Sequence, residues 1–427
     1  MSLQREIGLF GATMMGLGSI IGTGVFVSIG IAAGIAGANV VLAIALAAGV
    51  ATCNALSSAQ LAAAHPVSGG TYEYGYRWLT PSLGFAAGWM FLCAKTASAA
   101  TAALGFAGYL LNATGQDVKW LAYVAVATVV ALTVVVLSGI RLSTRVNIAI
   151  VSTTLLALLA FVIAGIPAVS TNRLKLSFEP QSLLHAAALM FVAFTGYGRI
   201  ATLGEEVVAP RRTIPRAIVA TLLISTALYI AVAAVGVGAA GAEALHAATS
   251  EKGAPLEIVA RGFPLKVHAL VAVGAMTAML GVLLNLLLGL SRVLLAMGRR
   301  GDMPRAAETL NVAVVAVGVV IAGLAAWGDV KTTWSFSAFT VLVYYAVTNL
   351  AALRLPPDER LYRPVWAWGG LLACLALAFS IEPAIWATGV GTLAAGLIWH
   401  RFRRGARLER ESAASTSRPP GKLTLDG

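Results

Sequence analysis

One stretch of the sequence decides the fold: Gly18-Ser19-Ile20-Ile21-Gly22-Thr23-Gly24-Val25-Phe26. It lies inside the first apolar run, residues 7–36, which is long enough to cross a bilayer as one helix. Because each glycine costs a helix interior about 1 kcal/mol relative to alanine, the stretch favours an opening of the backbone. In hydrocarbon, unpaired backbone N–H and C=O groups are tolerated only where they line a cavity or are buried in protein. The stretch therefore predicts a membrane protein with a polar ligand at the break.

The whole chain has the composition of a membrane protein. Of its 427 residues, 59% are hydrophobic and only 11% are charged. We therefore expect an all-α membrane protein with twelve transmembrane helices embedded in a lipid bilayer. The twelve apolar runs lie at residues 7–35, 38–62, 81–111, 119–139, 145–168, 182–207, 214–240, 266–298, 308–327, 333–354, 364–380 and 383–400.

The net charge of +12 is not evidence for nucleic-acid binding. If the N-terminus is cytoplasmic, the inner segments hold about three times as many Lys and Arg residues as the outer loops, as the positive-inside rule requires. This distribution predicts a multi-pass protein of the cell (inner or plasma) membrane with both termini in the cytoplasm. It also argues against a nucleic-acid partner.

A second interrupted run resembles the first. The sixth apolar run contains Phe191-Val192-Ala193-Phe194-Thr195-Gly196-Tyr197-Gly198-Arg199, again a Gly-x-Gly beside a threonine. Two discontinuous helices, 1 and 6, five spans apart indicate a five-plus-five inverted repeat with the ligand between the breaks. The alternative is that the glycines only permit close helix packing. We expect repeats at 1–170 and 180–356, two extra C-terminal helices at 360–402, and a disordered cytoplasmic tail at 403–427.

Four motifs in the same order resemble those of the amino acid–polyamine–organocation (APC) transporters, and together they span most of the chain. The resemblance implies the five-plus-five inverted-repeat fold and transport by alternating access. The motifs are the first-helix stretch, Pro66-Val67-Ser68-Gly69-Gly70-Thr71-Tyr72, Gly204-Glu205-Glu206-Val207 to Pro210 with Thr213-Ile214-Pro215-Arg216-Ala217-Ile218, and Ser291-Arg292-Val293-Leu294-Leu295-Ala296-Met297 with Gly301-Asp302-Met303-Pro304.

The resemblance also implies which residues bind the substrate. Its carboxylate would meet backbone N–H groups at the first break, where a half-helix presents its positive dipole end. These N–H groups lie around Ile21, Gly22, Thr23 and Gly24. Its ammonium would meet carbonyls at the second break, those of Val192, Ala193 and Thr195. Tyr197 or Phe194 would close the site as an aromatic gate, or would only pack between helices.

A site made of backbone groups recognises a zwitterion without charged side chains. No acidic residue lies deep in spans one, three, six, eight or ten. We therefore expect a neutral amino acid, small or apolar, rather than arginine, lysine or a polyamine. The sequence shows no metal-ligand spacing and no catalytic arrangement, so we expect no metal, no cofactor and no enzymatic activity.

Lys95 lies near the centre of span three, and an intramembrane charge is a functional candidate. Several APC relatives carry a lysine in span five whose ammonium replaces a coupling sodium ion, and Thr154 falls at that position here. In one hypothesis Lys95 supplies that charge, and transport is proton-coupled or is exchange. In the other, hydroxyls of Ser152-Thr153-Thr154 help to coordinate sodium, and Lys95 serves substrate selection. A third alternative gives Lys95 a structural role only.

Arg199 lies just inward of the second break, and Glu206 follows two helical turns later on the same face. We expect the two residues to act at an inner gate or as a structural ion pair. Alternatively, Arg199 reaches the cytoplasmic surface by snorkelling. The sequence thus predicts a secondary active transporter of a neutral amino acid. The alternatives are sodium-coupled uptake and the efflux of an amino acid or polyamine.

Overall fold

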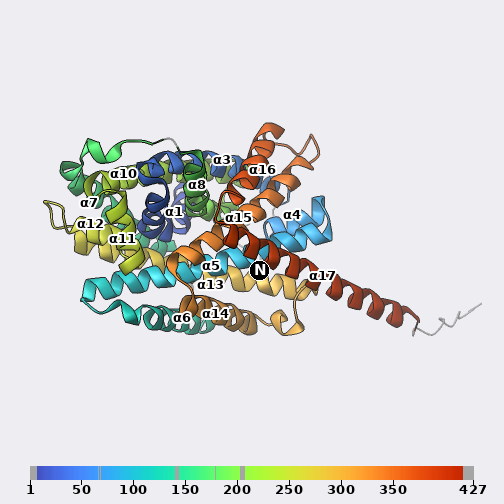
Figure 1. The fold of residues 1–427 in the computed structure, drawn as a ribbon. Coiled ribbons are helices and arrows are strands. Elements are labelled where there is room, and N and C mark those ends of the chain that lie inside the picture. Colours follow the sequence, from blue (N-terminus) through green and yellow to red (C-terminus); the bar gives the residue numbers. More distant parts are fainter. Residues whose placement is uncertain are drawn as a thin grey trace, which may run out of the picture.

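The computed structural model describes residues 7–65, 67, 69–139, 144–177, 179–201 and 207–416. Within these ranges the chain is helical without a β-strand (Figure 1), and one isolated backbone bridge joins Ile7 to Val207. The α-helices are α1 Leu9–Ile20, α2 Ile29–Ala36, α3 Val40–Ala64, α4 Thr71–Trp78, α5 Pro81–Thr114, α6 Leu121–Leu137, α7 Thr144–Gly165, α8 Pro180–Phe194, α9 Gly198–Ala201, α10 Pro210–Ala240, α11 Ala242–Lys252, α12 Pro255–Ala260, α13 His268–Arg300, α14 Leu310–Trp327, α15 Val330–Leu353, α16 Pro364–Ala378 and α17 Pro383–Thr416.

Short non-α turns join several of these helices. Two of them matter for the site: the π-helical turn η1, Gly24–Ser28, and the 3₁₀ turn η6, Thr195–Tyr197. The other turns, all 3₁₀, are η2 Gly37–Asn39, η3 Val118–Trp120, η4 Ile166–Ala168, η5 Thr171–Leu174 and η7 Arg305–Glu308.

The long helix α5 has clear start and stop signals in the sequence. Thr80 caps its N-terminus by accepting a hydrogen bond from the Leu83 N–H at 3.2 Å, and Pro81 occupies the first helical position. Gly115 ends the helix in the left-handed conformation, with φ of 68°. These signals determine where α5 begins and ends. The helix packs against α13 and α15.

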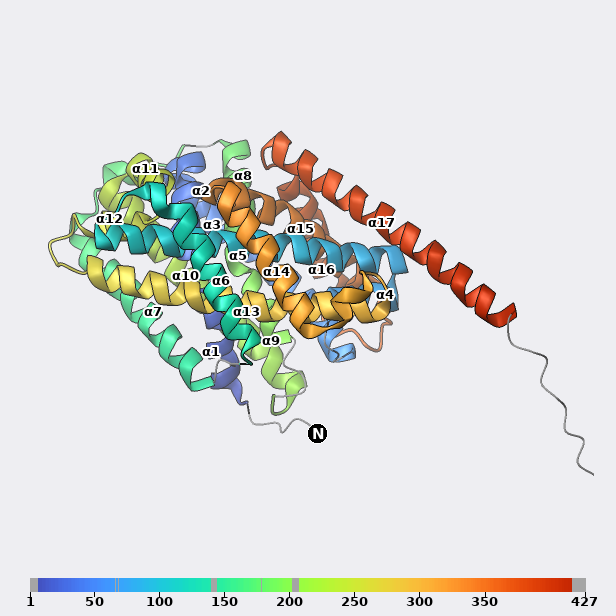
Figure 2. The same cartoon turned by 90° about the horizontal axis from the view of Figure 1, so that it is seen from below.

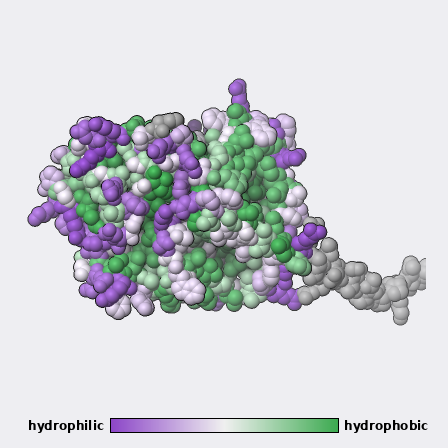
Figure 3. All heavy atoms as spheres, viewed as in Figure 1, coloured by the Kyte–Doolittle hydropathy of each residue, from purple (hydrophilic) through white to green (hydrophobic). Residues whose placement is uncertain are grey.

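The helices are more apolar outside than inside. The most apolar window of α6 is only 17% buried, whereas the less apolar window of α5 is 78% buried. A soluble bundle would have the reverse order, because its exposed faces would meet water. Figure 3 shows a continuous hydrophobic area over α16, with many hydrophilic residues at the other end of the bundle around α11 and α12. The chain is therefore a multi-pass membrane protein.

Nine helical segments of the described residues are long and apolar enough to cross a membrane. The number is ten if α16 and α17, which meet at an angle of 117°, count as one span. Each apolar run of the sequence corresponds to a helix or to a pair of helices. The all-α membrane class is confirmed, and the count of twelve spans in two inverted repeats stays a prediction.

The tail predicted to be disordered, residues 403–427, begins within helix α17, and its disorder stays a prediction. Helix α17 continues to Thr416, and its C-terminal part projects away from the bundle (Figures 1 and 2). Residues 403–416 are rich in arginine, glutamate and alanine, which extend a helix readily once it is nucleated. The remainder of the predicted tail, 417–427, lies outside the described residues.

The two interrupted segments lie next to each other in the bundle. Helix α1 contacts η6 and α9, while η1 and α2 contact α8. Figure 1 shows α1 and α8 close together, and α6 and α14 packed side by side at the edge of the bundle.

Candidate functional site between the two broken helices

The first break lies at Ile21 and Gly22. Helix α1 ends at Ile20, and Ile21 is extended, with φ of −79° and ψ of 106°. Helical bonding resumes where the N–H groups of Val25 and Phe26 donate to the Gly22 carbonyl, at 3.1 and 3.2 Å. The N–H groups of residues 22–24 precede these bonds, as the first N–H groups of any helix do. The interruption expected from the sequence is therefore present.

The second break is milder. Helix α8 ends at Phe194, η6 makes one tighter turn, and α9 continues from Gly198. The Thr195 hydroxyl donates to the Val192 carbonyl at 2.8 Å, and the Tyr345 hydroxyl donates to the Thr195 carbonyl at 3.4 Å. Because side-chain hydroxyls take up backbone carbonyls at this turn, it stays compact instead of opening as the first break does.

The two breaks touch through their backbones. A Cβ atom on Gly196 would lie 2.1 Å from the Ser19 carbonyl oxygen, and one on Gly24 would lie 2.4 Å from the Ala193 Cβ. The Tyr229 hydroxyl of α10 joins the same two segments: it lies 2.8 Å from the Ile20 oxygen and 3.4 Å from the Ala193 oxygen. The two interpretations of these glycines are thus compatible, because they sit at the turns and also permit close packing.

A small cavity of about 40 Å³ lies where the breaks meet. By the volume that one ordered water needs, it has room for roughly three waters. Five helical segments supply its wall: both interrupted helices, α5, α13 and α15. The lining residues are Ser19, Ile20, Thr23, Gly24, Lys95, Ser98, Val192, Ala193, Thr195, Gly196, Val282, Leu286 and Trp334.

Lys95 connects α5 to the second break. Its Nζ donates to the Thr195 Oγ1 at 2.7 Å, and among the described residues Lys95 is the one charged residue in the cavity lining. Among the residues that the structure describes, no carboxylate forms an ion pair with it. The Thr23 Oγ1, which belongs to the same lining, is buried and has no hydrogen-bond partner within the described part of the chain. The cavity therefore holds an ammonium and a hydroxyl donor ready for a ligand.

Several expected site residues line this cavity: Thr23, Gly24, Lys95, Val192, Ala193 and Thr195. Ile21 and Gly22 lie in the adjacent break but are not lining residues. Tyr197 and Phe194 are fully buried outside the lining, and their rings pack against Tyr345 and Tyr229 at centroid distances of 5.6 and 5.2 Å.

The remaining candidates lie away from the cavity. The Thr154 hydroxyl donates to the Ile150 carbonyl of its own helix, and Thr154 is not a lining residue. Arg199 is half-buried in α9 and is not a lining residue either. Glu206, its expected partner, lies outside the described residues. The roles assigned to these three residues stay predictions.

Sequence reasoning missed part of the wall. It did not select Ser98, Val282, Leu286 or Trp334, and it also missed the bridging Tyr229. Trp334, at the start of an apolar run, and Tyr229, in the middle of another, each carry a polar group, which is the one sequence signal for them. Nothing in the sequence distinguishes Val282 and Leu286 from other apolar residues of α13.

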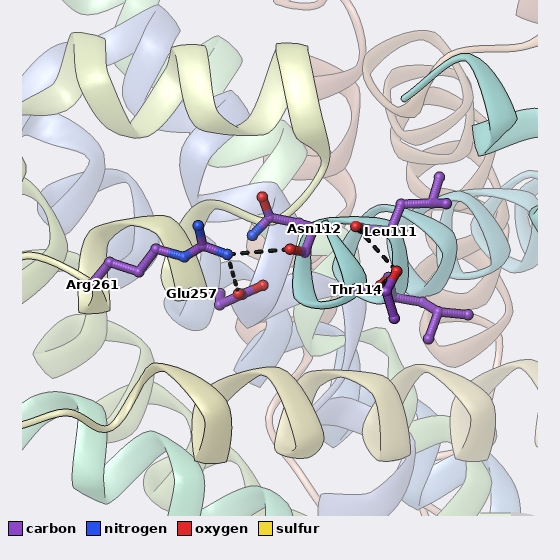
Figure 4. A network of polar contacts seen from close by, with 6 residues as sticks. Leu111, Asn112, Thr114, Glu257 and Arg261 are labelled. Atoms are coloured by element: carbon purple, nitrogen blue, oxygen red, sulfur yellow. Dashed lines mark hydrogen bonds and ion pairs between the residues drawn. The ribbon is translucent and has the colours of Figure 1, made fainter. Parts of the chain in front are cut away.

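A polar cluster joins α12 to α5 at one end of the bundle. The distribution of Lys and Arg predicts that this end lies on the side of the membrane away from the cytoplasm. Glu257 of α12 is 1% exposed, and its Oε1 accepts a hydrogen bond from Arg261 at 2.9 Å (Figure 4). Arg261 also donates to the Asn112 carbonyl of α5 at 3.2 Å. Beside this cluster, the Tyr109 hydroxyl donates to the Phe26 carbonyl at 2.8 Å. The α11–α12 segment is thereby linked to α5, and α5 to the first broken helix.

The other end contains a second cluster, centred on Asp302. Its Oδ2 accepts hydrogen bonds from the hydroxyls of Tyr72 and Tyr76, at 2.6 and 2.7 Å. Burial, followed by the hydrogen bond to Asp302, raises the pKa of both tyrosines, so both remain protonated donors. Arg300 pairs with Glu73 at 2.7 Å. This cluster holds α4 against the end of α13, where two of the sequence motifs meet.

Two interrupted helices around a small cavity, inside an apolar bundle, are typical of solute transporters. The comparisons with known proteins agree. Residues 11–362 match the amino acid permease family, and the chain belongs to this family. The resemblance to APC transporters is thus confirmed, and the general activity is amino-acid transport.

Similar proteins include transporters with and without a named substrate. An uncharacterized transporter of Mycobacterium tuberculosis is 41% identical, covering 94% of this chain and 92% of its own length. The branched-chain amino acid permease BcaP of Bacillus subtilis is 30% identical, covering 71% of this chain and 69% of its own length. The methylthioribose transporter of the same organism is 27% identical, covering 94% of each chain.

Proposed function

We propose that the protein is a secondary active transporter of a neutral amino acid that works by alternating access in the cytoplasmic membrane. The single observation that carries this proposal is the contact of the two breaks around one cavity, because backbone N–H and C=O groups then converge on the same small space. In this proposal the chain has twelve spans, two inverted repeats of five helices, and cytoplasmic termini.

The two ends of a zwitterion would bind at opposite breaks. The carboxylate meets the N–H groups of Gly22, Thr23 and Gly24 and the unpaired Thr23 hydroxyl, because this helix start combines free donors with a positive dipole end. The ammonium meets the carbonyls of Val192 and Ala193. The Ala193 carbonyl accepts the Tyr229 hydroxyl and can accept a second hydrogen bond. The Val192 carbonyl accepts both the N–H and the hydroxyl of Thr195, so it must release one of them to bind the ammonium.

A neutral substrate follows from the composition of the wall. Within the part of the chain that the structure describes, no carboxylate lines the cavity to pair with a cationic side chain, while Val282 and Leu286 supply an apolar surface. The name of the relative BcaP, a branched-chain amino acid permease, agrees with a neutral substrate. The volume of the cavity favours a short side chain.

Lys95 is the proposed coupling group. It bonds to Thr195 at the turn that must rearrange when the cavity changes the side to which it opens. A change in the charge of Lys95 would therefore alter the stability of that turn. This link between the charge of Lys95 and the turn favours proton-coupled transport or exchange. Thr154, bonded within its own helix, has no contact with the cavity that would favour the sodium-coupled alternative.

The test is reconstitution of the purified protein in liposomes. Uptake and binding of the standard amino acids, and of methylthioribose, are measured with and without sodium at two pH values. We expect uptake of a neutral amino acid that responds to a pH gradient or to amino acid on the opposite side, without sodium. Failure to bind any amino acid under every condition would falsify the proposal. Sodium dependence, or export alone, would favour the alternatives.

A further inference from the structure

We propose that Lys95 sets the charge selectivity of the cavity. It disfavours amino acids with a cationic side chain, and it favours side chains that offer a hydrogen-bond acceptor. This inference rests on the proposed binding of an amino acid at the two breaks, and it assigns the selectivity to one residue.

The cavity has an excess of hydrogen-bond donors over open acceptors. Lys95 has three N–H groups and uses one on Thr195, and the Thr23 hydroxyl has no partner. The carbonyls at the breaks, in contrast, already accept hydrogen bonds from hydroxyl groups, at Val192 from Thr195 and at Ile20 from Tyr229. A ligand with additional acceptors would therefore satisfy groups that the protein leaves open, whereas a ligand with additional donors would not.

The Lys95 ammonium lies in the part of the wall that the substrate side chain would meet. If the substrate carboxylate and ammonium occupy the two breaks, its side chain is left with the wall formed by Lys95, Ser98 and the apolar residues of α13. The Ser98 hydroxyl shares a hydrogen bond with the Ser337 hydroxyl at 2.7 Å. A second cation about 6 Å from the Lys95 ammonium, at an effective dielectric constant of about 20, would lower affinity roughly a hundredfold.

The α-ammonium does not contribute to differences in affinity between amino acids. It belongs to every amino acid and is accompanied by its own carboxylate, so its interaction with Lys95 is common to all substrates. Only the charge at the end of the side chain differs. The small cavity requires short probes that match in length. L-2,4-diaminobutyrate, L-homoserine and L-aspartate meet this condition, with a cationic, a neutral and an anionic side chain.

The experiment measures binding of these three probes to the full-length protein by competition with the amino acid that binds best. In the unsubstituted protein we expect L-2,4-diaminobutyrate to bind about a hundredfold more weakly than L-homoserine. We expect L-aspartate to bind more strongly than L-2,4-diaminobutyrate. In Lys95→Met the difference between the cationic and the neutral probe should fall below about tenfold.

Lys119→Met is the matched control, because Lys119 is an exposed lysine in η3, away from the cavity. It should keep the full discrimination. If Lys95→Met does not fold, as judged by gel filtration and thermal unfolding, Lys95→Gln replaces it. Equal binding of the three probes to the unsubstituted protein overturns the inference, and so does unchanged discrimination in a folded Lys95 variant. Absence of binding by any amino acid contradicts the proposed function instead, so the two failures are distinguishable.

Discussion

The contact between the two breaks predicts a strong effect of one methyl group, added by Gly196→Ala. The new Cβ would lie 2.1 Å from the Ser19 oxygen, 2.3 Å from the Ser19 carbonyl carbon and 2.7 Å from the Ile20 nitrogen. All three are backbone atoms, so no side chain can rotate away. Since favourable separations are about 3.5 Å, the two segments must move apart by roughly 1.4 Å.

Overpacking of this kind costs about 1–3 kcal/mol, which corresponds to roughly a 5- to 150-fold loss if the cost falls on the closed, substrate-binding arrangement. We expect Gly196→Ala to lower amino-acid affinity by this factor in a binding assay on detergent-solubilised protein. The matched control is Gly289→Ala in α13, because a Cβ at Gly289 meets nothing within 4 Å. The control should retain affinity and gain up to about 1 kcal/mol of stability. Wild-type binding and transport by Gly196→Ala would refute the proposed contact.

Two further substitutions test the groups around the site. Tyr229→Phe removes the hydroxyl that bonds to the Ile20 oxygen, and we expect a loss of about 1 kcal/mol in stability, measured as a lower unfolding temperature, together with weaker binding. A Tyr229→Phe protein with unchanged unfolding and binding would show that this bridge is unimportant. Arg261→Ala leaves the buried Glu257 carboxylate without its partner. We expect a loss of about 1–3 kcal/mol, below that of a fully buried pair because Arg261 is half-exposed, and Glu257→Gln in the same chain should restore most of it. Equal unfolding temperatures for the single and double variants would contradict this account.

The helices and the first break could be predicted because they depend on local sequence. Long apolar runs form helices in a membrane, and the glycines beside Thr23 open the backbone where a helix is weakest. The 3₁₀ turn at Thr195 was less predictable. Its compact form depends on two hydroxyl groups that donate to backbone carbonyls of the turn, those of Thr195 and Tyr345. Tyr345 is distant in sequence, so its contribution has no local signal.

The wall of the cavity could not be derived from local sequence. The bond between Lys95 and Thr195 exists only because α5 packs beside the second break, and helix packing of this kind has no signature in one sequence. For the same reason the apolar wall residues Val282 and Leu286 look like any others on α13. The placement of Thr154, in contrast, was inferred from a resemblance, and its side chain bonds within its own helix.

In the proposed function, the two breaks bind the two ends of one zwitterion. The most direct measurement is competition for binding by the best amino acid substrate, its N-acetyl derivative and its carboxamide. The first derivative removes the ammonium that the Val192 and Ala193 carbonyls would accept, and the second removes the carboxylate that the Thr23 and Gly24 N–H groups would bind. Each lost charged hydrogen-bonding group should weaken binding by about tenfold or more. Competition by either derivative as strong as that of the parent amino acid would contradict the claim.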